Sequence, residues 1–173
     1  MQLPINGDGG TIKGVELSGQ YAFGFGLGFI LNYTYSDSKS PTKNDIDSNL
    51  PIPGVPEHAV NAQIYYQLGG FEARMSYGWR DKSFQNNFGF TDETFATPAG
   101  PATSITRTYG VWERDYGQLD AQIAYQFTES LGVTLEGINL TEEDRTQYLQ
   151  YPNLPFNFES GSRRILLGIR GKF

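Results

Sequence analysis

The most regular feature of the chain is an alternation of apolar and polar residues that returns in several segments. In Val15–Phe23 the odd-numbered positions are apolar or small, whereas Glu16, Ser18 and Gln20 lie between them. Leu27–Tyr35 repeats the odd-numbered apolar series. Since a period of two places alternate side chains on opposite faces of a strand, the pattern predicts β-strands with one apolar and one polar face.

The alternation continues along the chain and predicts about seven strands, most of them paired in hairpins. Glycine-rich or short polar turns join them at residues 24–26, 69–70 and 128–130. Gly137 is expected to form a β-bulge, because the apolar residues after it change parity. The expected strands are residues 11–23, 27–35, 62–68, 71–80, 119–127, 131–140 and 163–173.

Long connections alternate with these short turns, and we expect loops at about residues 36–57, 85–111 and 142–162. The first contains Pro51, Pro53 and Pro56, which exclude a central strand. Alternating short and long connections indicate an up-and-down antiparallel meander. Short turns at one rim and long loops at the other are the layout of an outer-membrane barrel.

The composition of the apolar face indicates that it faces lipid. Its predicted positions contain no Asp, Glu, Lys or Arg, whereas the opposite face carries Glu16, Arg74, Asp120 and Glu136. A charge facing the middle of the bilayer costs about 2–4 kcal/mol. The expected fold is therefore all-β, an antiparallel up-and-down meander of about seven strands that is part of a transmembrane outer-membrane β-barrel. A soluble sandwich would also have one apolar face.

The amino-acid composition further limits the classes of protein to which the chain could belong. The 173 residues include no cysteine, so a disulfide framework is excluded, and the net charge of −6 argues against nucleic acid as a partner. No run approaches the roughly 20 apolar residues of a membrane-spanning helix.

The two ends of the sequence lead to an expectation about its origin. The first ten residues lack the features of a signal peptide, and the last strand closes on Phe173, an aromatic that is typical of the last strand of an outer-membrane barrel. An odd number of strands leaves two open edges, which lipid does not tolerate. Residues 1–173 are therefore expected to be a C-terminal barrel segment without plug domain or signal peptide.

Three segments, in order, resemble the C-terminal part of a TonB-dependent outer-membrane receptor. They are GTIKGVELSGQYAF, LPIPGVPEHAVNAQIYYQLGGFEARMSYGWRDKSF and LDAQIAYQFTESLGVTLEGINLTEEDRTQY. The resemblance implies a larger barrel with an N-terminal plug that imports scarce ligands, with energy transmitted from the inner membrane. The plug and the earlier strands would be supplied by the parent receptor. The resemblance also implies that the barrel-insertion machinery reads Phe173 as an assembly signal.

Candidate binding residues lie in or beside the long loops, where aromatic rings can stack on a ligand and arginines can donate hydrogen bonds. Alternatively, Trp112 and several of the tyrosines would form an interfacial girdle or pack the loops together. The candidates for ligand contact are Phe88, Phe90, Tyr109, Trp112, Arg114, Arg145 and Tyr148.

No constellation for catalysis, metal binding or a cofactor is visible. His58 is the single histidine, and the acidic residues Asp45, Asp47 and 142–144 lack the spacing of a calcium loop. We therefore expect no enzyme activity, no metal and no cofactor.

The favoured function is the C-terminal barrel portion of a receptor that imports a carbohydrate or siderophore-type nutrient across the bacterial outer membrane. Its expected partners are outer-membrane lipid, the insertion machinery, the rest of the parent receptor and a small-molecule ligand. The alternative is a soluble or surface β-domain that binds a ligand, such as a carbohydrate, through its aromatic loops. Such a domain would purify without detergent.

Overall fold

The computed structural model of the chain describes residues 9–93 and 104–171, and every regular element within them is a β-strand. Phe173, the expected assembly signal, lies outside these residues. In this described part the structure has no helix that is long and apolar enough to cross a membrane.

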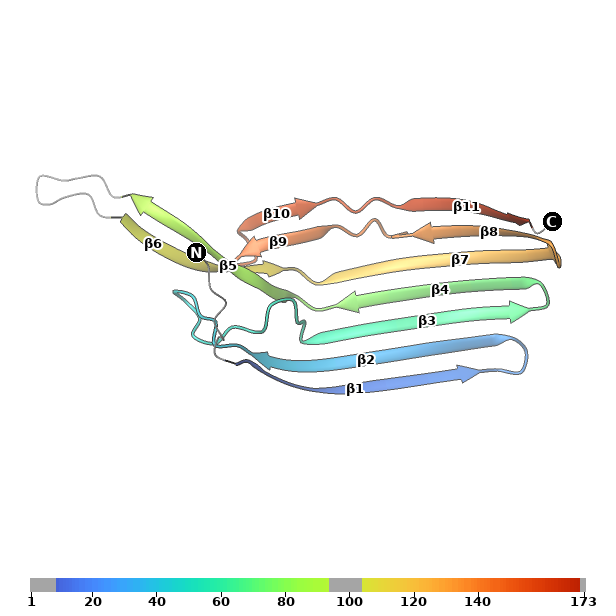
Figure 1. Cartoon of the computed structure of the whole chain (residues 1–173), viewed down its shortest axis with the longest axis horizontal. Helices are drawn as coiled ribbons and strands as arrows, with labels where there is room; N and C mark the ends of the chain where they lie inside the picture. The colour runs from blue at the N-terminus through green and yellow to red at the C-terminus, as the bar shows by residue number, and fades with distance from the viewer. Residues whose placement is uncertain (1–8, 94–103, 172–173) are drawn as a thin grey trace, which may run out of the picture.

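Seven strands form one antiparallel sheet in the order β1-β2-β3-β4-β7-β8-β11 (Figure 1). The predicted meander of about seven strands is confirmed. Neighbours along the chain are neighbours in the sheet, except where two hairpins are inserted between β4 and β7 and between β8 and β11. The strands are β1 Thr11–Ala22, β2 Leu27–Lys39, β3 His58–Leu68, β4 Phe71–Arg80, β7 Tyr116–Thr128, β8 Leu131–Ile138 and β11 Arg164–Gly171.

The pairing register places the predicted apolar residues on one face across the whole sheet. Residues directly opposite each other in antiparallel strands have side chains on the same face. One row, with a residue from each strand, consists of Tyr21, Phe29, Ile64, Met75, Ala121, Gly137 and Ile165. The adjacent row on the other face includes Tyr65, Arg74, Gln122 and Glu136. The predicted segregation of faces therefore holds in the structure.

The short turns explain how this register is set. Leu68 pairs with Phe71 across a two-residue turn in which Gly69 has a φ of 57°, a left-handed conformation that glycine adopts without strain. At the third turn the Thr128 hydroxyl accepts hydrogen bonds from the amides of Ser130 and Leu131. Phe127 is left as the extra residue of a bulge there.

The expected bulge lies just beyond Gly137, where the amide of Leu140 donates to the carbonyl of Leu119 although a regular register would place Asn139 there. Gly137 pairs in regular register with Ala121 and Ile165, and the chain changes direction two residues later at Asn139, whose φ is 53°. The parity change in the sequence therefore reflects one extra residue between Gly137 and Leu140, at the end of β8.

Two of the segments expected to be loops contain strands. Ser83–Glu93 (β5), Ser104–Glu113 (β6), Arg145–Leu149 (β9) and Pro155–Glu159 (β10) form a second sheet in the order β10-β9-β6-β5. Sequence reasoning missed these strands because the alternation there lasts only about four residues at a time, as in Phe88–Thr91 and Phe156–Glu159. Backbone pairing still continues, since β5 and β6 prolong β4 and β7, and β9 and β10 prolong β8 and β11 beyond short breaks (Figure 1).

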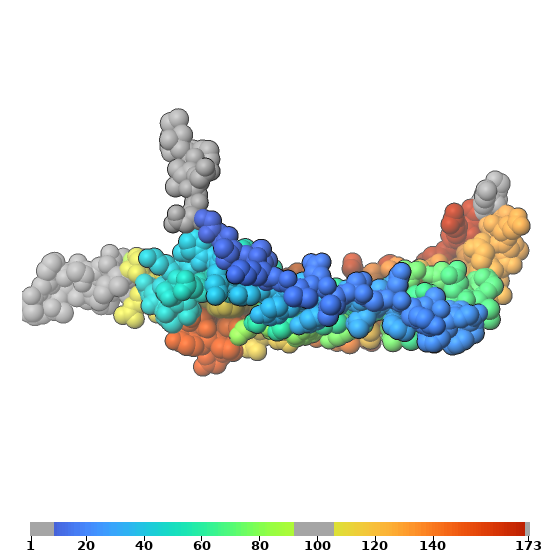
Figure 2. Space-filling model, turned by 90° about the horizontal axis from the view of Figure 1, so that it is seen from below, coloured from blue at the N-terminus to red at the C-terminus, as the bar shows by residue number. Residues whose placement is uncertain are grey.

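Seen edge-on, the seven-stranded sheet is a single layer (Figure 2). Its apolar side chains are exposed, up to 75% for Ile169. The buried core lies instead at the second sheet, against the first loop (residues 40–57), and consists of Leu50, Phe84, Val111 and Tyr148.

Candidate ligand-binding site

The structure places all seven candidate residues in or next to the second sheet. Phe88 and Phe90 lie on β5, Tyr109 and Trp112 on β6, and Arg145 and Tyr148 on β9, whereas Arg114 follows β6 directly. Residues that are distant in the sequence are thus brought together at the end of the molecule where the long connections lie.

Four aromatic rings form a cluster on one face of this sheet. The ring centroids are 4.9 Å apart for Phe88 and Phe90, 5.1 Å for Phe88 and Phe156, and 6.0 Å for Phe90 and Tyr109, all edge to face. Phe88, Phe90 and Phe156 remain exposed. The cluster is therefore a pre-formed apolar platform on which a ring or a sugar face could stack.

Trp112 and Tyr148 are cross-strand partners on the opposite face, where they pack instead of facing solvent. Phe84 lies edge to face against Trp112 at 5.6 Å, and the guanidinium of Arg114 lies 5.6 Å from the centre of the Tyr148 ring. Tyr148 is only 5% exposed. These contacts position the second sheet and leave little of the Tyr148 ring free for a ligand, whereas Trp112 is half-buried.

Burial raises the pKa of Tyr148 above its ordinary value of 10.0, with Asp81 and Asp115 acting in the same direction and Arg114 opposing. A raised pKa means that the folded state holds the proton more strongly. The stability from neutral Tyr148 is thus complete below pH 10.0 and is lost as the pH rises through the folded pKa. We expect a difference absorbance titration of the protein against Tyr148→Phe to show one phenol that ionises above pH 10.0.

Gln150 locks the first loop onto the second sheet. Its Oε1 accepts hydrogen bonds from the amide of Gly110 at 3.0 Å and from the side chain of Asn44 at 3.1 Å. Its Nε2 donates to Asp47 at 2.7 Å. Nearby, the Thr108 amide donates to Asp45 at 2.5 Å. Asp45 and Asp47 are therefore structural anchors of the loop.

We expect Gln150→Ala to free the first loop without unfolding the barrel sheet. The substitution removes the acceptor of two hydrogen bonds and the donor of a third, each worth about 0.5–1.5 kcal/mol, more for the bond to a carboxylate. Hydrogen exchange at residues 40–57 should accelerate, while β2 and β3 keep their protection. Unchanged exchange in the loop would show that Gln150 does not hold it.

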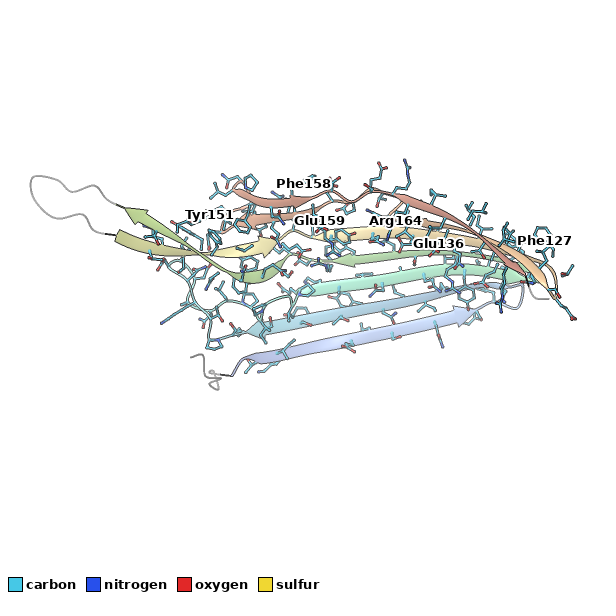
Figure 3. The ribbon with its side chains drawn as sticks, turned by 45° about the horizontal axis from the view of Figure 1, so that its top comes forward. Phe127, Glu136, Tyr151, Phe158, Glu159 and Arg164 are labelled. Carbon is cyan, nitrogen blue, oxygen red and sulfur yellow. The ribbon has the colours of Figure 1, made fainter. Side chains whose placement is uncertain are left out.

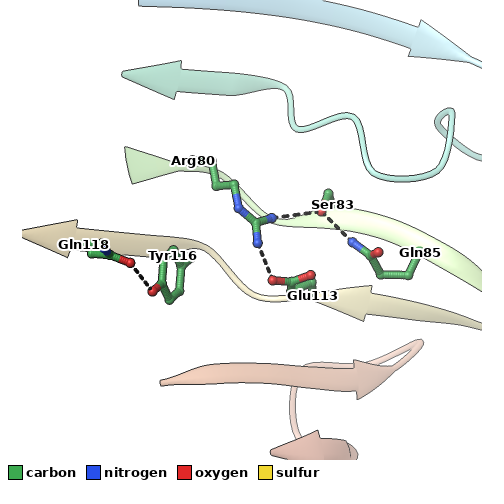
Figure 4. A network of polar contacts seen from close by, with 6 residues as sticks. All are labelled: Arg80, Ser83, Gln85, Glu113, Tyr116 and Gln118. Carbon is green, nitrogen blue, oxygen red and sulfur yellow. Dashed lines mark hydrogen bonds and ion pairs between the residues drawn. The ribbon is translucent and has the colours of Figure 1, made fainter. Parts of the chain in front are cut away.

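A polar network joins the two sheets. Arg80, at the end of β4, forms an ion pair with Glu113 and donates to Ser83, which also accepts from Gln85 (Figure 4). Tyr116 donates to Gln118 at 2.8 Å. This network ties the second sheet to the polar face of the first.

Beside this network lies a polar hollow of about 510 Å³. Ligand pockets in proteins commonly measure about 300–1,000 Å³. The hollow lies where β7, β8 and β11 meet the connections to β9 and β10. It is lined by Tyr116, Gln118, Ile138, Asn139, Glu143, Arg145, residues 159–162 and Arg164.

A backbone clamp shapes one wall of the hollow. Buried Asn139 accepts a hydrogen bond from the amide of Glu143 and donates to its carbonyl, while its own amide donates to Asp120. Asp144 accepts from the amide of Gly161 at 2.9 Å. Of the candidate residues, only Arg145 lines this hollow. The wall residues were missed because they recur at no motif spacing, and only the order Asn139 to Asp144 at a strand end hinted at a turn.

No group of acidic, cysteine or histidine side chains in the described residues is arranged to hold a metal ion. His58 accepts or donates at 2.8 Å through Nδ1 with the hydroxyl of Tyr33, and its ring lies 5.4 Å from that of Tyr35. This group belongs to the apolar face near the loop end of the sheet.

Comparison with known proteins gives one family. The family model described as TonB dependent receptor-like, beta-barrel matches residues 2–140. No curated protein and no solved structure matches the chain.

Proposed function

Because the chain belongs to the TonB-dependent receptor β-barrel family, we propose that it forms part of the wall and mouth of a receptor that imports a scarce nutrient across the bacterial outer membrane. The nutrient is of the carbohydrate or siderophore type. The family is one of receptors and transporters, and its members have a plug and an outer-membrane setting.

The observation that carries this proposal is the uninterrupted apolar face of the sheet. Within the described residues, no second layer covers it, and Leu31, Met75, Ile123 and Leu167 are all more than 40% exposed. Soluble monomers rarely expose apolar patches larger than a few hundred Å². The alternative of a soluble β-domain would require a cover for this face, whereas lipid contact accounts for it directly.

In the proposed receptor, the two sheets have different roles. The polar face of the seven-stranded sheet lines the lumen, and the second sheet and first loop form the mouth where the ligand arrives. β1 and β11 are the outer strands of the sheet among the described residues. Their free edges would pair with the remaining strands of the parent receptor, since an open edge is not tolerated in lipid.

The proposal can be tested in the bacterium of origin by deleting the parent gene. We expect loss of energy-dependent uptake of one nutrient class at limiting concentration, with restoration by the intact gene. The protein itself should fractionate with the outer membrane. Recovery from the soluble fraction without detergent would contradict the proposal.

A further inference from the structure

We propose that the hollow between β7, β8 and β11 binds an uncharged, hydroxyl-rich ligand of oligosaccharide size. This inference rests on the proposed function and names the ligand class at one site of the mouth. Four charged residues line the hollow: Glu143, Arg145, Glu159 and Arg164.

These four side chains carry both signs of charge, yet they do not pair with one another. The ion pairs among the described residues join other groups, including Arg163 with Glu142 at 3.3 Å right beside the hollow. Glu159 and Arg164 lie on either side of the connection from β10 to β11 (Figure 3). The backbone therefore presents two carboxylates and two guanidinium groups to the same space while holding them apart.

The position of Arg145 explains why Glu159 stays free. The two residues are direct cross-strand partners in β9 and β10, an arrangement in which opposite charges commonly pair. The guanidinium of Arg145 lies instead 5.0 Å from the centre of the Tyr116 ring, on which Arg80 also lies, at 5.7 Å. Cation–π contact with Tyr116 thus fixes Arg145 and leaves its donors available at the hollow.

The mixture of charges selects the class of ligand. A polyanion such as a phosphate or a ferric catecholate would gain from the arginines but would face Glu143 and Glu159, and a polycation would meet the arginines. A hydroxyl group both donates and accepts, so an uncharged polyol can donate to the carboxylates and accept from the guanidinium groups. The walls of the hollow are held by the hydrogen bonds of Asn139 with Glu143 and of Asp144 with Gly161. Because these residues are already ordered, less conformational entropy is lost when a ligand binds.

The test uses the purified parent receptor in detergent and an array of neutral tri- and tetrasaccharides of glucose, xylose and N-acetylglucosamine. We expect at least one to bind, with affinity about tenfold weaker in Glu159→Ala and in Arg164→Ala, since each removes hydrogen bonds to a charged group. Arg163→Ala is the matched control, because Arg163 is adjacent but pairs with Glu142. It should change the affinity less than twofold.

Three further probes are inorganic phosphate, triglycine and a ferric catecholate. Binding of any of them at this hollow, with none of the oligosaccharides, would overturn the proposal, as would failure of the whole array to bind. Oligosaccharide binding that the Glu159 and Arg164 variants leave intact would place the site elsewhere. Energy-dependent nutrient uptake by cells that carry the same variants tests the import function separately. Normal uptake together with no binding at this hollow would contradict the inference about the hollow but not the proposed import function.

Discussion

Replacing Ile123 by lysine should strongly destabilise the inserted barrel. Ile123 lies midway along β7, between Ala73 and Leu135 in the register, on the apolar face. A lysine that faces lipid near the midplane costs about 2–4 kcal/mol, a large share of the roughly 5–15 kcal/mol by which folded proteins are stable. The measurement is reversible unfolding in lipid vesicles, with the yield of protein in the outer membrane as the cellular readout.

The adjacent residue provides the control. Gln122 belongs to the same strand but lies on the polar face between Arg74 and Glu136, so Gln122→Lys adds the same charge toward the lumen. We expect this variant to insert normally. Its free energy of unfolding should lie within about 0.5 kcal/mol of the wild-type value, as is usual for surface substitutions. Equal loss in both variants would show that the two faces do not differ in their environment.

The membrane sheet could be predicted because lipid imposes a rule on every second residue. The alternation in Val15–Phe23 and Leu27–Tyr35 reflects one apolar and one polar environment, and the hairpin turns fix how the strands meet. Beyond the membrane that constraint ends. Phe88 and Tyr109 lie on strands although the alternation around them is short, because backbone pairing there prolongs β4 and β7.

The site could be predicted only as a region. Residue types that suit ligand contact pointed to the long connections, where the second sheet lies, but the sequence does not show that Tyr148 is buried and Phe88 exposed. Nor does it show that Arg145 lies over Tyr116, since that contact joins β9 to the start of β7. The lock formed by Gln150 with Asn44 and Asp47 spans about a hundred residues and follows from the docking of the first loop.

The second large effect is expected at Gly161, in the connection from β10 to β11. A Cβ at this position would overlap with the carbonyl oxygen of Glu143 and lie 2.7 Å from Nδ2 of Asn139. Both neighbours are fixed by the Asn139 clamp, so the connection itself must move. We expect Gly161→Ala to break the hydrogen bond from its amide to Asp144 and to displace the wall of the hollow.

Overpacking of this kind costs about 1–3 kcal/mol, and the loss should stay local because β8 and β11 remain paired over eight residues. Proteolysis of intact cells should cut the β9–β10 hairpin faster, while the barrel remains heat-modifiable on gels. Gly168→Ala is the control, since a Cβ there meets nothing closer than 3.9 Å. If both variants resist protease equally, the clamp tolerates a side chain at Gly161, and the close packing against Glu143 does not shape the mouth.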